Sequence, residues 1–470
     1  MAAVVVLGAG VNGLSTAMLL ARDGHCVTVL ERDPEEPPND ATVAWDSWNR
    51  RGVRQFRMLH LLLPRWRHVM EAELPDGLES LEGWGGLRIN MLGLHPRSTI
   101  GGLRPGDERF VTVTARRPVV EAALASAARA TGGVTIRRGV AVSGVVVEDA
   151  PHGTPHVAGV RSDGGEELRA DLVIDAGGRQ SALPRWLDAA GTRQPLEFRE
   201  ESGFVYYARH FRAPDGRMPE GRGSALQHFS SVSIVVLPAD NGTYSVGFVA
   251  SAQDRVARAL RDPDRWDAAL ARYPTMEHWG KGDPITGVDA MAGIEDRRRR
   301  YVVGDAPVAT GIVAIGDAWG CTNPSLGRGI TIGLLHACAL RDVVREVGTD
   351  DSEKLVRRFD EVTETTVGTI YDQTLTMDRH RLAEIRADIE GRTYETDDRY
   401  WSIVKRLVAA MQHDGELVRT FSGIAALLDR PDDALARPGI MERVIELGAV
   451  GPQYPTPGPS RRELESIIDR

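Results

Sequence analysis

The N-terminal segment carries the clearest hydrophobic pattern in the chain. Val4 to Leu7 form a short apolar run rich in β-branched residues, which is typical of a buried parallel strand. Apolar residues at helical spacing follow from Leu14 to Leu20, and Gly24 provides a natural helix end. A second apolar run from Cys26 to Leu30 leads to Glu31. The pattern predicts a strand, a helix and a parallel strand, in that order.

Three glycines connect the first predicted strand to the helix with the spacing G-x-G-x-x-G. Gly8 permits the tight turn, Gly10 lets the backbone approach a pyrophosphate, and Gly13 lets the helix pack closely on the sheet. The helix start offers free N–H groups to phosphate, and Glu31 is placed to accept hydrogen bonds from an adenosine ribose. An acid there disfavours the 2′-phosphate of NADP. The segment predicts a bound dinucleotide, with FAD and NAD as alternatives.

Strand-like patterns occupy the middle of the chain. Residues 203–212 contain aromatic and β-branched residues at strand density. Residues 230–238 and 243–250 predict a hairpin whose turn lies at residues 240–242. We expect residues 86–112 to add one or two strands to this antiparallel sheet.

The apolar spacing becomes helical in the last part of the chain. Apolar residues between Leu355 and Val367 recur at helical intervals, and a second helical run covers about 398–429. The tail at 451–459 is rich in proline and glycine and is expected to be irregular. We expect residues 346–470 to form a helical cap on the dinucleotide-binding domain or at a subunit interface.

Length, charge and cysteine content narrow the class of protein. A chain of 470 residues is too long for one core and suggests roughly two or three domains. The net charge of -9 disfavours nucleic acid as a partner. No stretch reaches the roughly 18 apolar residues of a membrane span, and the three cysteines form neither a disulfide framework nor a metal spacing. His152 and His156 lack acidic or cysteine partners for a metal. We therefore expect a cytoplasmic protein with no metal site and no membrane span.

A second glycine motif, within residues 310–334, indicates which dinucleotide is bound. A short apolar strand ends at Gly316 and Asp317, and Pro324 precedes two further glycines and a helix. This motif resembles the aromatic-hydroxylase superfamily of FAD monooxygenases, which has Gly-Asp followed by P-x-x-G-x-G-x-N; this chain has Thr331 in place of the Asn. The resemblance implies that the cofactor is FAD and that Asp317 binds its ribityl hydroxyls. It also implies that the helix start, with Leu326, Gly327, Arg328, Gly329 and Ile330, faces the pyrimidine edge of the flavin, where a helix N-terminus stabilises negative charge.

The segment at residues 114–128 resembles another helix of this superfamily, which begins with Arg and Pro. Arg117 and Pro118 occupy those places, and Pro118 suits a first helical turn. The resemblance implies that Arg117 lies beside the cofactor, with Arg116 as the competing assignment. We expect a further cofactor contact at Arg32.

Residues 50–64 resemble a segment of the epoxidase-like branch of the superfamily. In that branch an Arg-Gly stretch, a Gln and a His precede a leucine-rich helix, and Arg51, Gln55 and His60 fill these places. The resemblance implies that this region reaches the ribityl chain or the ring of the flavin. For His60 the alternative is a buried core histidine.

The predicted strand ending at Asp175 is followed by a departure from the ordinary aromatic hydroxylases. Those enzymes have an Asp-Gly pair linked to both FAD and NADPH, whereas this chain has Gly177 and Gly178. The sequence D-A-G-G-R-x-S resembles the flavin epoxidase branch, which includes squalene, polyether and styrene-type epoxidases; some flavin halogenases and isoprenoid reductases share it. Electrons are therefore expected from NAD(P)H directly or through a separate flavin reductase.

The dispersal of the FAD motifs predicts the domain organisation. They occupy residues 1–82, 113–190 and 301–345, as expected for a glutathione-reductase-type α/β fold with a Rossmann-like parallel sheet. A mainly antiparallel β substrate domain, residues 83–112 and 191–300, interrupts this FAD-binding domain, and the helical region 346–470 follows. Tyr206, Arg209 and Phe229 are the candidate substrate contacts.

The family resemblance implies a reaction that the cofactor carries. We expect an FAD-dependent monooxygenase that uses O2 and transfers one oxygen atom from a flavin hydroperoxide to a hydrophobic small molecule, by hydroxylation or epoxidation in natural-product metabolism. Because the chemistry belongs to the flavin, no side chain is required as a catalyst, and His60 and Arg209 are the candidates. An FAD oxidase, dehydrogenase or isoprenoid-type reductase is the first alternative. A flavin halogenase, whose W-x-W-x-I-P signature is absent from the sequence, and a non-redox binding protein of the same fold are the others.

Overall fold

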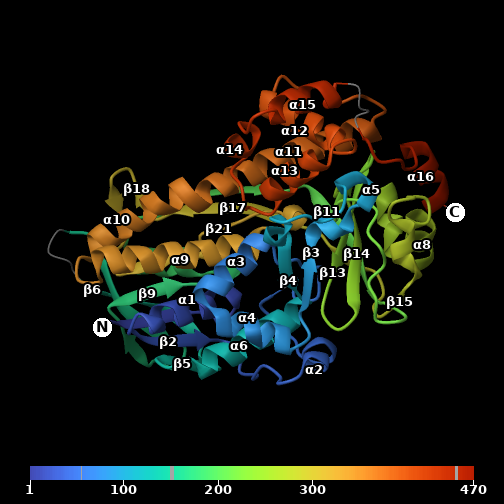
Figure 1. The fold of residues 1–470 in the computed structure, drawn as a ribbon. Coiled ribbons are helices and arrows are strands. Elements are labelled where there is room, and N and C mark those ends of the chain that lie inside the picture. The colour runs from blue at the N-terminus through green and yellow to red at the C-terminus, as the bar shows by residue number, and fades with distance from the viewer. Residues whose placement is uncertain (54, 149–152, 450–453, 470) are drawn as a thin grey trace.

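The computed structural model of the chain describes residues 1–53, 55–148, 153–449 and 454–469. Its N-terminal part is built on a five-stranded parallel sheet with the strand order β20-β9-β1-β2-β5 (Figure 1). Together with the antiparallel sheets and helices described below, this sheet confirms the mixed α/β class predicted from the sequence. The five strands are β1 (Ala3–Leu7), β2 (Cys26–Glu31), β5 (Val134–Arg138), β9 (Leu172–Asp175) and β20 (Ile312–Ala314).

Both faces of the parallel sheet are covered, which explains why β1 is apolar throughout. Val4 and Val6 enter a core shared with helices, whereas Val5 and Leu7 enter a core shared with a three-stranded β-meander on the opposite face. The helices are α1 (Val11–Arg22), α6 (Arg117–Ala130) and α9 (Gly329–Val347). The meander consists of β6 (Val142–Glu148), β7 (His156–Ser162) and β8 (Glu167–Arg169).

A six-stranded antiparallel sheet forms the second layer, and its two faces carry different residues. Tyr207 and Phe211 pack against helices α8 (Pro263–Leu270) and α16 (Arg461–Ile468). Tyr206 and Ala208 pack toward helix α11 (Thr369–Ile389), because side chains alternate along a strand. The strands are β11 (Phe204–Arg212), β12 (Leu226–His228), β13 (Val232–Pro238), β14 (Thr243–Ser251), β15 (Asp283–Pro284) and β16 (Asp289–Met291).

Strands β3 (Leu87–Asn90) and β4 (Val111–Thr114) depart from the expectation for residues 86–112. They pair only with each other and form a separate two-stranded sheet, so the expected extension of the antiparallel sheet was wrong. The segment between them explains the difference. Ile100 and Phe110 are buried in a core with the C-terminal helices, and this packing directs the segment toward those helices.

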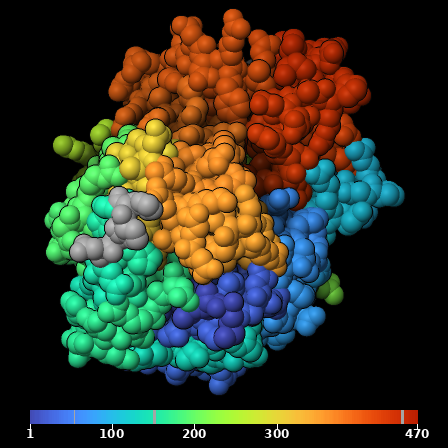
Figure 2. Space-filling view, turned by 90° about the vertical axis from the view of Figure 1, so that its left-hand side faces the viewer, coloured from blue at the N-terminus to red at the C-terminus, as the bar shows by residue number. Residues whose placement is uncertain are grey.

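The C-terminal helices lie mainly above the two large sheets (Figure 1), and in the space-filling view the darker orange and red residues are at the top while lighter orange residues lie against the blue N-terminal residues (Figure 2). Helix α10 (Ser352–Thr363) continues through a π-helical turn into α11. Further helices are α12 (Arg399–Ala410), α13 (Gly415–Ala425), α14 (Pro431–Leu435) and α15 (Ile440–Gly448). The predicted tail at 451–459 lies partly outside the described residues, and the predicted domain boundaries stay a prediction.

The remaining elements connect these layers. A three-stranded sheet consists of β10 (Leu196–Glu201), β17 (Glu295–Arg300) and β21 (Gly320–Cys321). The short strands β18 (Val302–Val303) and β19 (Ala306–Pro307) pair with each other. The smaller helices are α2 (Ala41–Asp46), α3 (Pro64–Glu73), α4 (Pro75–Gly83), α5 (Arg97–Ile100) and α7 (Leu183–Ala189).

Candidate cofactor and substrate site

A cavity of about 1160 Å³ opens at the carboxyl ends of the parallel strands. Residues that follow β1, β2, β9 and β20 line one part of it, which is where open α/β sheets bind their ligands. The cavity continues past the antiparallel sheet to the C-terminal helices. This volume exceeds the roughly 300–1,000 Å³ of ordinary ligand pockets. One space therefore has room for a dinucleotide and a second molecule.

The glycine turn after β1 has the geometry that a pyrophosphate requires. Gly8 has a φ of +102°, and a Cβ there would lie 2.8 Å from the carbonyl oxygen of Ala176. A Cβ on Gly13 would lie 2.0 Å from the carbonyl oxygen of Gly8, so α1 and β1 touch through backbone. At Gly10 the nearest such atom is 3.9 Å away, and no side chain caps the helix that starts there. The first turn of α1 thus offers free N–H groups and open space to an anion.

Glu31 is buried at the end of β2, and the loops around it hold it in place. Its carboxylate accepts hydrogen bonds from the backbone N–H of Ala9, at 2.9 Å, and of Asp33, at 3.0 Å. It also forms an ion pair with Arg50. Each carboxylate oxygen can accept more than one hydrogen bond, so Glu31 retains capacity for a ribose hydroxyl. Arg32 also lines the cavity.

Arg50 is a cofactor-site residue that sequence reasoning missed. Its guanidinium is buried, lines the cavity and bridges Glu31 and Glu121. The predicted neighbour, Arg51, is exposed and is not among the residues that line the cavity. The two arginines are adjacent in an irregular loop with no periodicity to choose between them, so only the fold assigns the inward position to Arg50.

The choice between Arg116 and Arg117 is clear from their partners. Arg116 is buried in an ion pair with Asp240, at 2.6 Å, away from the cavity. Arg117 lines the cavity and donates through Nε to Glu121, at 2.7 Å. Burial opposes ionisation of Glu121, but Arg50 and Arg117 outweigh it and hold the pKa of that carboxyl below its usual value.

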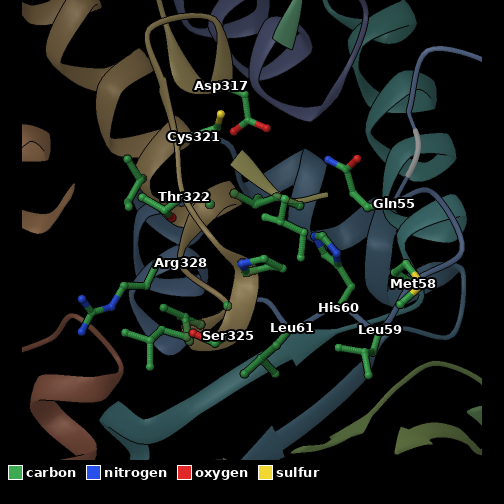
Figure 3. A pocket seen from close by; sticks show the side chains of 18 of the residues that line it. Gln55, Met58, Leu59, His60, Leu61, Asp317, Cys321, Thr322, Ser325 and Arg328 are labelled. Carbon is green, nitrogen blue, oxygen red and sulfur yellow. The ribbon is translucent and has the colours of Figure 1, made fainter. Parts of the chain in front are cut away.

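Asp317 and the loop after it enter the cavity opposite Gln55 and His60 (Figure 3). Gly316 adopts a φ of +54°, which turns the chain out of β20 and exposes Asp317 to the cavity. The loop ends where α9 begins at Gly329, and no side chain caps this helix and no acid occupies its first turn. Pro324, Gly327, Gly329 and Ile330 all line the cavity beside this helix start. Its free N–H groups suit the negatively charged edge of a reduced flavin.

Arg328 takes part in this loop in a different way from the one expected. Its side chain points away from Gln55 and His60 (Figure 3), and Nη1 donates to Thr374 Oγ1 of α11 at 3.0 Å. It is buried without a carboxylate partner among the residues that the structure describes, and burial lowers its pKa. The side chain therefore ties the loop to α11, and only the backbone of Arg328 is placed beside the helix start.

A buried polar network connects the same loop to the antiparallel sheet. Tyr206 donates its hydroxyl to Asn323 Oδ1, at 2.8 Å, while Asn323 Nδ2 and Ser325 Oγ donate to Asp378 Oδ1, at 3.2 and 2.7 Å. Burial raises the pKa of Asp378 to about 7. The ring of Tyr206 lines the cavity, but its hydroxyl is committed to holding the loop.

Arg209 and Phe229 lie outside the cavity. Arg209 is on the opposite face of β11 from Tyr206, where it pairs with Asp267, at 2.8 Å. Phe229 packs edge-on against Tyr273, with ring centroids 4.6 Å apart, in the core beneath α8. The sequence predicted strands here, but the strand register decides which face each side chain takes.

His60 lines the cavity, and Gln55 lies nearby (Figure 3). Burial, reinforced by the charge of Arg117, lowers the pKa of His60 to about 3. His60 is therefore neutral at physiological pH, and its ring nitrogens have no hydrogen-bond partner within the described part of the chain. A neutral imidazole can orient a ligand but does not supply a cationic acid.

The turn after β9 is closed by Asp175. Its carboxylate accepts hydrogen bonds from the backbone N–H of Gly177, at 2.9 Å, and from the hydroxyl of Ser181. Gly178, with a φ of +70°, completes the turn, and Gly177 and Gly178 both line the cavity. The acid of D-A-G-G-R-x-S thus shapes the loop, and burial raises its pKa.

Cys321 lies near Asp317 in the cavity wall (Figure 3). Burial raises the pKa of its thiol to about 11, which disfavours the thiolate needed for covalent attachment to a flavin. Among the described residues, no group of three His, Cys, Asp or Glu side chains is arranged to hold a metal ion. In the same residues, every helix is too short or too polar to cross a membrane.

The second part of the cavity, which we call the chamber, is mainly apolar. Its walls come from the segment after Gln55, from the antiparallel sheet and from α12 and α13. The sequence predicted the helices without indicating that they line the site. The apolar lining includes Met58, Leu59, Leu61, Leu226, Val235, Leu237, Trp401, Val404, Val408, Met411, Phe421 and Ile424.

Two comparisons of sequence agree with this cofactor site. The FAD dependent oxidoreductase family matches residues 3–95, which contain the first glycine motif. Protein Rv3254 of Mycobacterium tuberculosis (strain ATCC 25618 / H37Rv) is 31% identical over 372 residues, which are 73% of this chain and 72% of that protein. The chain is an FAD-dependent oxidoreductase. Within that class it belongs to the same family as Protein Rv3254.

Solved structures with a similar fold include FAD-dependent and flavin-dependent enzymes. PqsL, a probable FAD-dependent monooxygenase from Pseudomonas aeruginosa, matches 82% of this chain and 99% of its own at a TM-score of 0.59 and 16% identity. CmlS, a flavin-dependent halogenase, matches 100% of this chain and 76% of its own at a TM-score of 0.58 and 17% identity. These similarities establish an FAD-binding flavoprotein fold, which different flavin chemistries share.

Proposed function

We propose that the protein is an FAD-dependent monooxygenase that inserts one atom of dioxygen into a hydrophobic small molecule, and that it belongs to the epoxidase-like branch. The overall reaction consumes O2, two electrons and two protons; one oxygen atom enters the substrate and the other leaves as water. Hydroxylation of an electron-rich ring and epoxidation of an alkene both satisfy this balance. The observation that most strongly supports this function is the apolar chamber, which is continuous with the cofactor part of the same cavity.

The residues that line the cofactor part of the cavity fit FAD, and each group of them would hold a different part of the cofactor. Gly8, Gly10 and the start of α1 would hold the pyrophosphate, Glu31 the ribose and Asp317 the ribityl hydroxyls. When bound and reduced, FAD supplies the electrons that activate dioxygen. The uncapped start of α9 would stabilise negative charge at the pyrimidine edge.

The chamber contributes binding and exclusion of water. Apolar side chains from the sheet and from α12 and α13 surround the substrate, which favours a hydrophobic molecule and keeps the reacting atoms dry. Oxygen insertion of this kind needs positioning more than proton transfer. His60 and Gln55, both neutral, would orient the substrate or the flavin ring.

The electron donor is part of the proposal. The carboxylate of Asp175 is used within its own turn, so the Asp-Gly pair that links FAD to NADPH in ordinary aromatic hydroxylases has no equivalent at Gly177 and Gly178. This favours delivery of electrons by a separate flavin reductase over direct reduction by NAD(P)H. Anaerobic mixing of the holoenzyme with NADH or NADPH should leave the flavin oxidised until a flavin reductase is added; rapid direct bleaching would contradict the reductase route.

Rapid mixing of the chemically reduced holoenzyme with oxygen tests the oxygen chemistry. A monooxygenase should pass through a transient absorption band distinct from those of reduced and oxidised flavin, and a hydrophobic substrate should change its decay. An oxidase would return directly to the oxidised spectrum with one peroxide released per flavin. The second outcome, with and without candidate substrates, would overturn the proposed function.

A further inference from the structure

One polar side chain on the chamber wall has an unused hydrogen-bonding atom. His228 ends β12 and lies opposite Ser233 in the register of β12 and β13. Its ring lines the chamber, and Nδ1 is 2.8 Å from Ser233 Oγ. Nε2 has no hydrogen-bond partner among the residues that the structure describes.

The hydrogen bonds of Ser233 determine whether Nε2 of His228 donates or accepts. Arg381 of α11 donates through Nε to Ser233 Oγ, at 3.0 Å. An arginine has no acceptor, so the hydroxyl hydrogen of Ser233 cannot be directed at it. Among the described residues Ser233 Oγ has no hydrogen-bond partner other than Arg381 and His228, so its hydrogen is donated to Nδ1 of His228. Nδ1 is then an acceptor, and in a neutral imidazole the proton must lie on Nε2.

Arg381, which donates to Ser233, is rigidly held. Arg381 also donates to the backbone carbonyls of Phe229 and Val232, at 2.8 and 2.7 Å, and pairs with Glu384 at 3.1 Å. Its side chain is buried and shares Glu384 with Lys405, whose Nζ is 3.0 Å from that carboxylate. Reorientation of Arg381 would break several buried hydrogen bonds at once. The donor and acceptor roles from Arg381 through Ser233 to His228 are therefore fixed.

The charges that face His228 keep its ring neutral. Burial lowers its pKa well below the usual value, and the nearby cations Arg381 and Lys405 lower it further. Both cations are paired with Glu384, and Asp388, which accepts a hydrogen bond from Tyr454, lies in the same cluster. The cluster thus presents a neutral N–H to the chamber with little unbalanced positive charge.

We propose that Nε2–H of His228 is the hydrogen-bond donor that orients the substrate, and that the substrate is a hydrophobic molecule with a neutral acceptor oxygen, such as a carbonyl or an ether. This inference rests on the proposed function for the position of the substrate. The acceptor oxygen binds at His228, and the apolar remainder fills the chamber toward the flavin.

Helix α11 sets the position of this donor relative to the cofactor loop. Asp378 on α11 holds Asn323 and Ser325, and Arg381 on the same helix holds Ser233. Three residues correspond to a rise of about 4.5 Å along an α-helix. The anchor of the cofactor loop and the anchor of the donor are therefore parts of one rigid element, so the oxygen bound at His228 has a fixed place relative to the loop.

The tautomer of His228 can be measured without a substrate. Two-bond proton–nitrogen correlation spectra of the oxidised holoenzyme, labelled with nitrogen isotope in histidine, separate the two neutral tautomers, and His228→Gln identifies the signal. The wild type should show the Nε2–H form. Ser233→Thr, which retains the hydroxyl, should keep this form, and Ser233→Ala should shift the ring toward the Nδ1–H form. A wild-type His228 in the Nδ1–H form would overturn the proposal even if a variant fails to fold.

Ligand preference provides the second test. The probes are a long-chain methyl ketone and the alkane of equal length, titrated into the oxidised holoenzyme and followed by the flavin spectrum and by calorimetry. The wild type should prefer the ketone by about threefold to tenfold, as expected for one neutral hydrogen bond. His228→Phe should remove this preference and retain alkane binding, and His228→Gln, which keeps an N–H donor, should preserve it. His413→Phe, at an exposed histidine outside the cavity, is the matched control.

The outcomes separate this inference from the proposed function. Equal affinity for both probes in the wild type, an unchanged preference in His228→Phe, or failure of both probes to bind would each overturn the assignment of His228. None of these measurements involves turnover. An enzyme that binds the ketone through His228 but releases only peroxide in the oxygen experiment would keep the donor site and lose the monooxygenase function.

Discussion

The two parts of the cavity differ in how their chemistry is built. On the cofactor side, backbone groups and close glycine contacts form most of the proposed binding surface, as at Gly8, Gly10 and the start of α9. On the chamber side, side chains from the sheet and the C-terminal helices meet only because the chain folds back on itself. Cofactor identity therefore depends on short local motifs, whereas substrate choice depends on long-range packing.

The largest effect is expected at the closest glycine contact on the cofactor side. Gly13→Val would place a branched side chain where even a Cβ lies 2.0 Å from the carbonyl oxygen of Gly8. The contact is backbone on backbone, so α1 must move away from β1 and the pyrophosphate site is lost. We expect purified protein without flavin and a loss of stability of about 3 kcal/mol or more.

Flavin absorbance and urea unfolding check this prediction. Gly83→Ala, at the end of α4, is the control, because a Cβ there meets no atom within 4 Å. Normal flavin content in Gly13→Val would mean that the cofactor side tolerates a displaced helix, and the contrast between the two regions would disappear.

The next effect is expected where the C-terminal helices attach. Arg419 of α13 and Asp107 are both buried and joined by an ion pair of 2.7 Å. Arg419→Met leaves Asp107 without its partner and should cost about 3 kcal/mol. We expect faster proteolysis near α13 and weaker binding of hydrophobic ligands, with FAD still bound. The ion pair between exposed Arg443 and half-buried Asp414 provides the control, and Arg443→Met should cost less than about 0.5 kcal/mol. Loss of FAD together with chamber function would show that the two regions are not separable.

A smaller effect on affinity is expected at Asp317. Asp317→Ala removes the carboxylate proposed to bind the ribityl hydroxyls, and hydrogen bonds to charged groups contribute roughly 1.5–3 kcal/mol. The Kd for FAD should therefore rise by about tenfold to a hundredfold, while ketone binding in the FAD-saturated protein stays close to that of wild type. Fluorescence titration of the apoprotein measures this, with the exposed Asp305→Ala as control. An unchanged Kd would remove Asp317 from the cofactor site.

Expressed per pH unit, the smallest effect is a pH dependence at the junction of the two regions. Because the pKa of Asp378 is raised to about 7, the folded state binds its proton more tightly than the unfolded state does. Stability contributed by this group is therefore present at low pH and falls as the pH rises from about 4 to about 7, by at most about 1.4 kcal/mol per pH unit. Asp378→Asn should remove this dependence. Urea unfolding at about pH 5 and about pH 8 checks it, with exposed Asp397→Asn as control; equal slopes in Asp378→Asn and wild type would contradict it.

The parts of the cofactor site that lie in local motifs could be predicted from the sequence. The strand, glycine turn, helix and acid from Ala3 to Glu31 are contiguous, so their geometry follows from spacing and is present as expected. The loop from Asp317 into α9 was predictable for the same reason. Arg50 was not, because its inward direction depends on Glu31 and Glu121, which lie far from it in the sequence.

The chamber could not be predicted from sequence patterns. The strand containing Tyr206 and Arg209 was predictable, but which of these side chains faces the cavity depends on the register of β11 in its sheet. The pairing of β3 with β4 follows from burial of Ile100 against the C-terminal helices, which no local pattern encodes. His228 gains its role only from Ser233 and from Arg381, more than a hundred residues away in the sequence.

The most direct test of the proposed oxygen transfer uses isotopically labelled dioxygen. The holoenzyme, supplied with a flavin reductase and NADH, is offered a panel of long-chain alkenes and aromatic compounds that carry a carbonyl or an ether oxygen, and the organic products are analysed by mass spectrometry. We predict products that contain one oxygen atom derived from dioxygen, and none from labelled water in the reciprocal experiment. Peroxide formed in proportion to the reductant consumed, with no label in any organic product, would contradict the monooxygenase function.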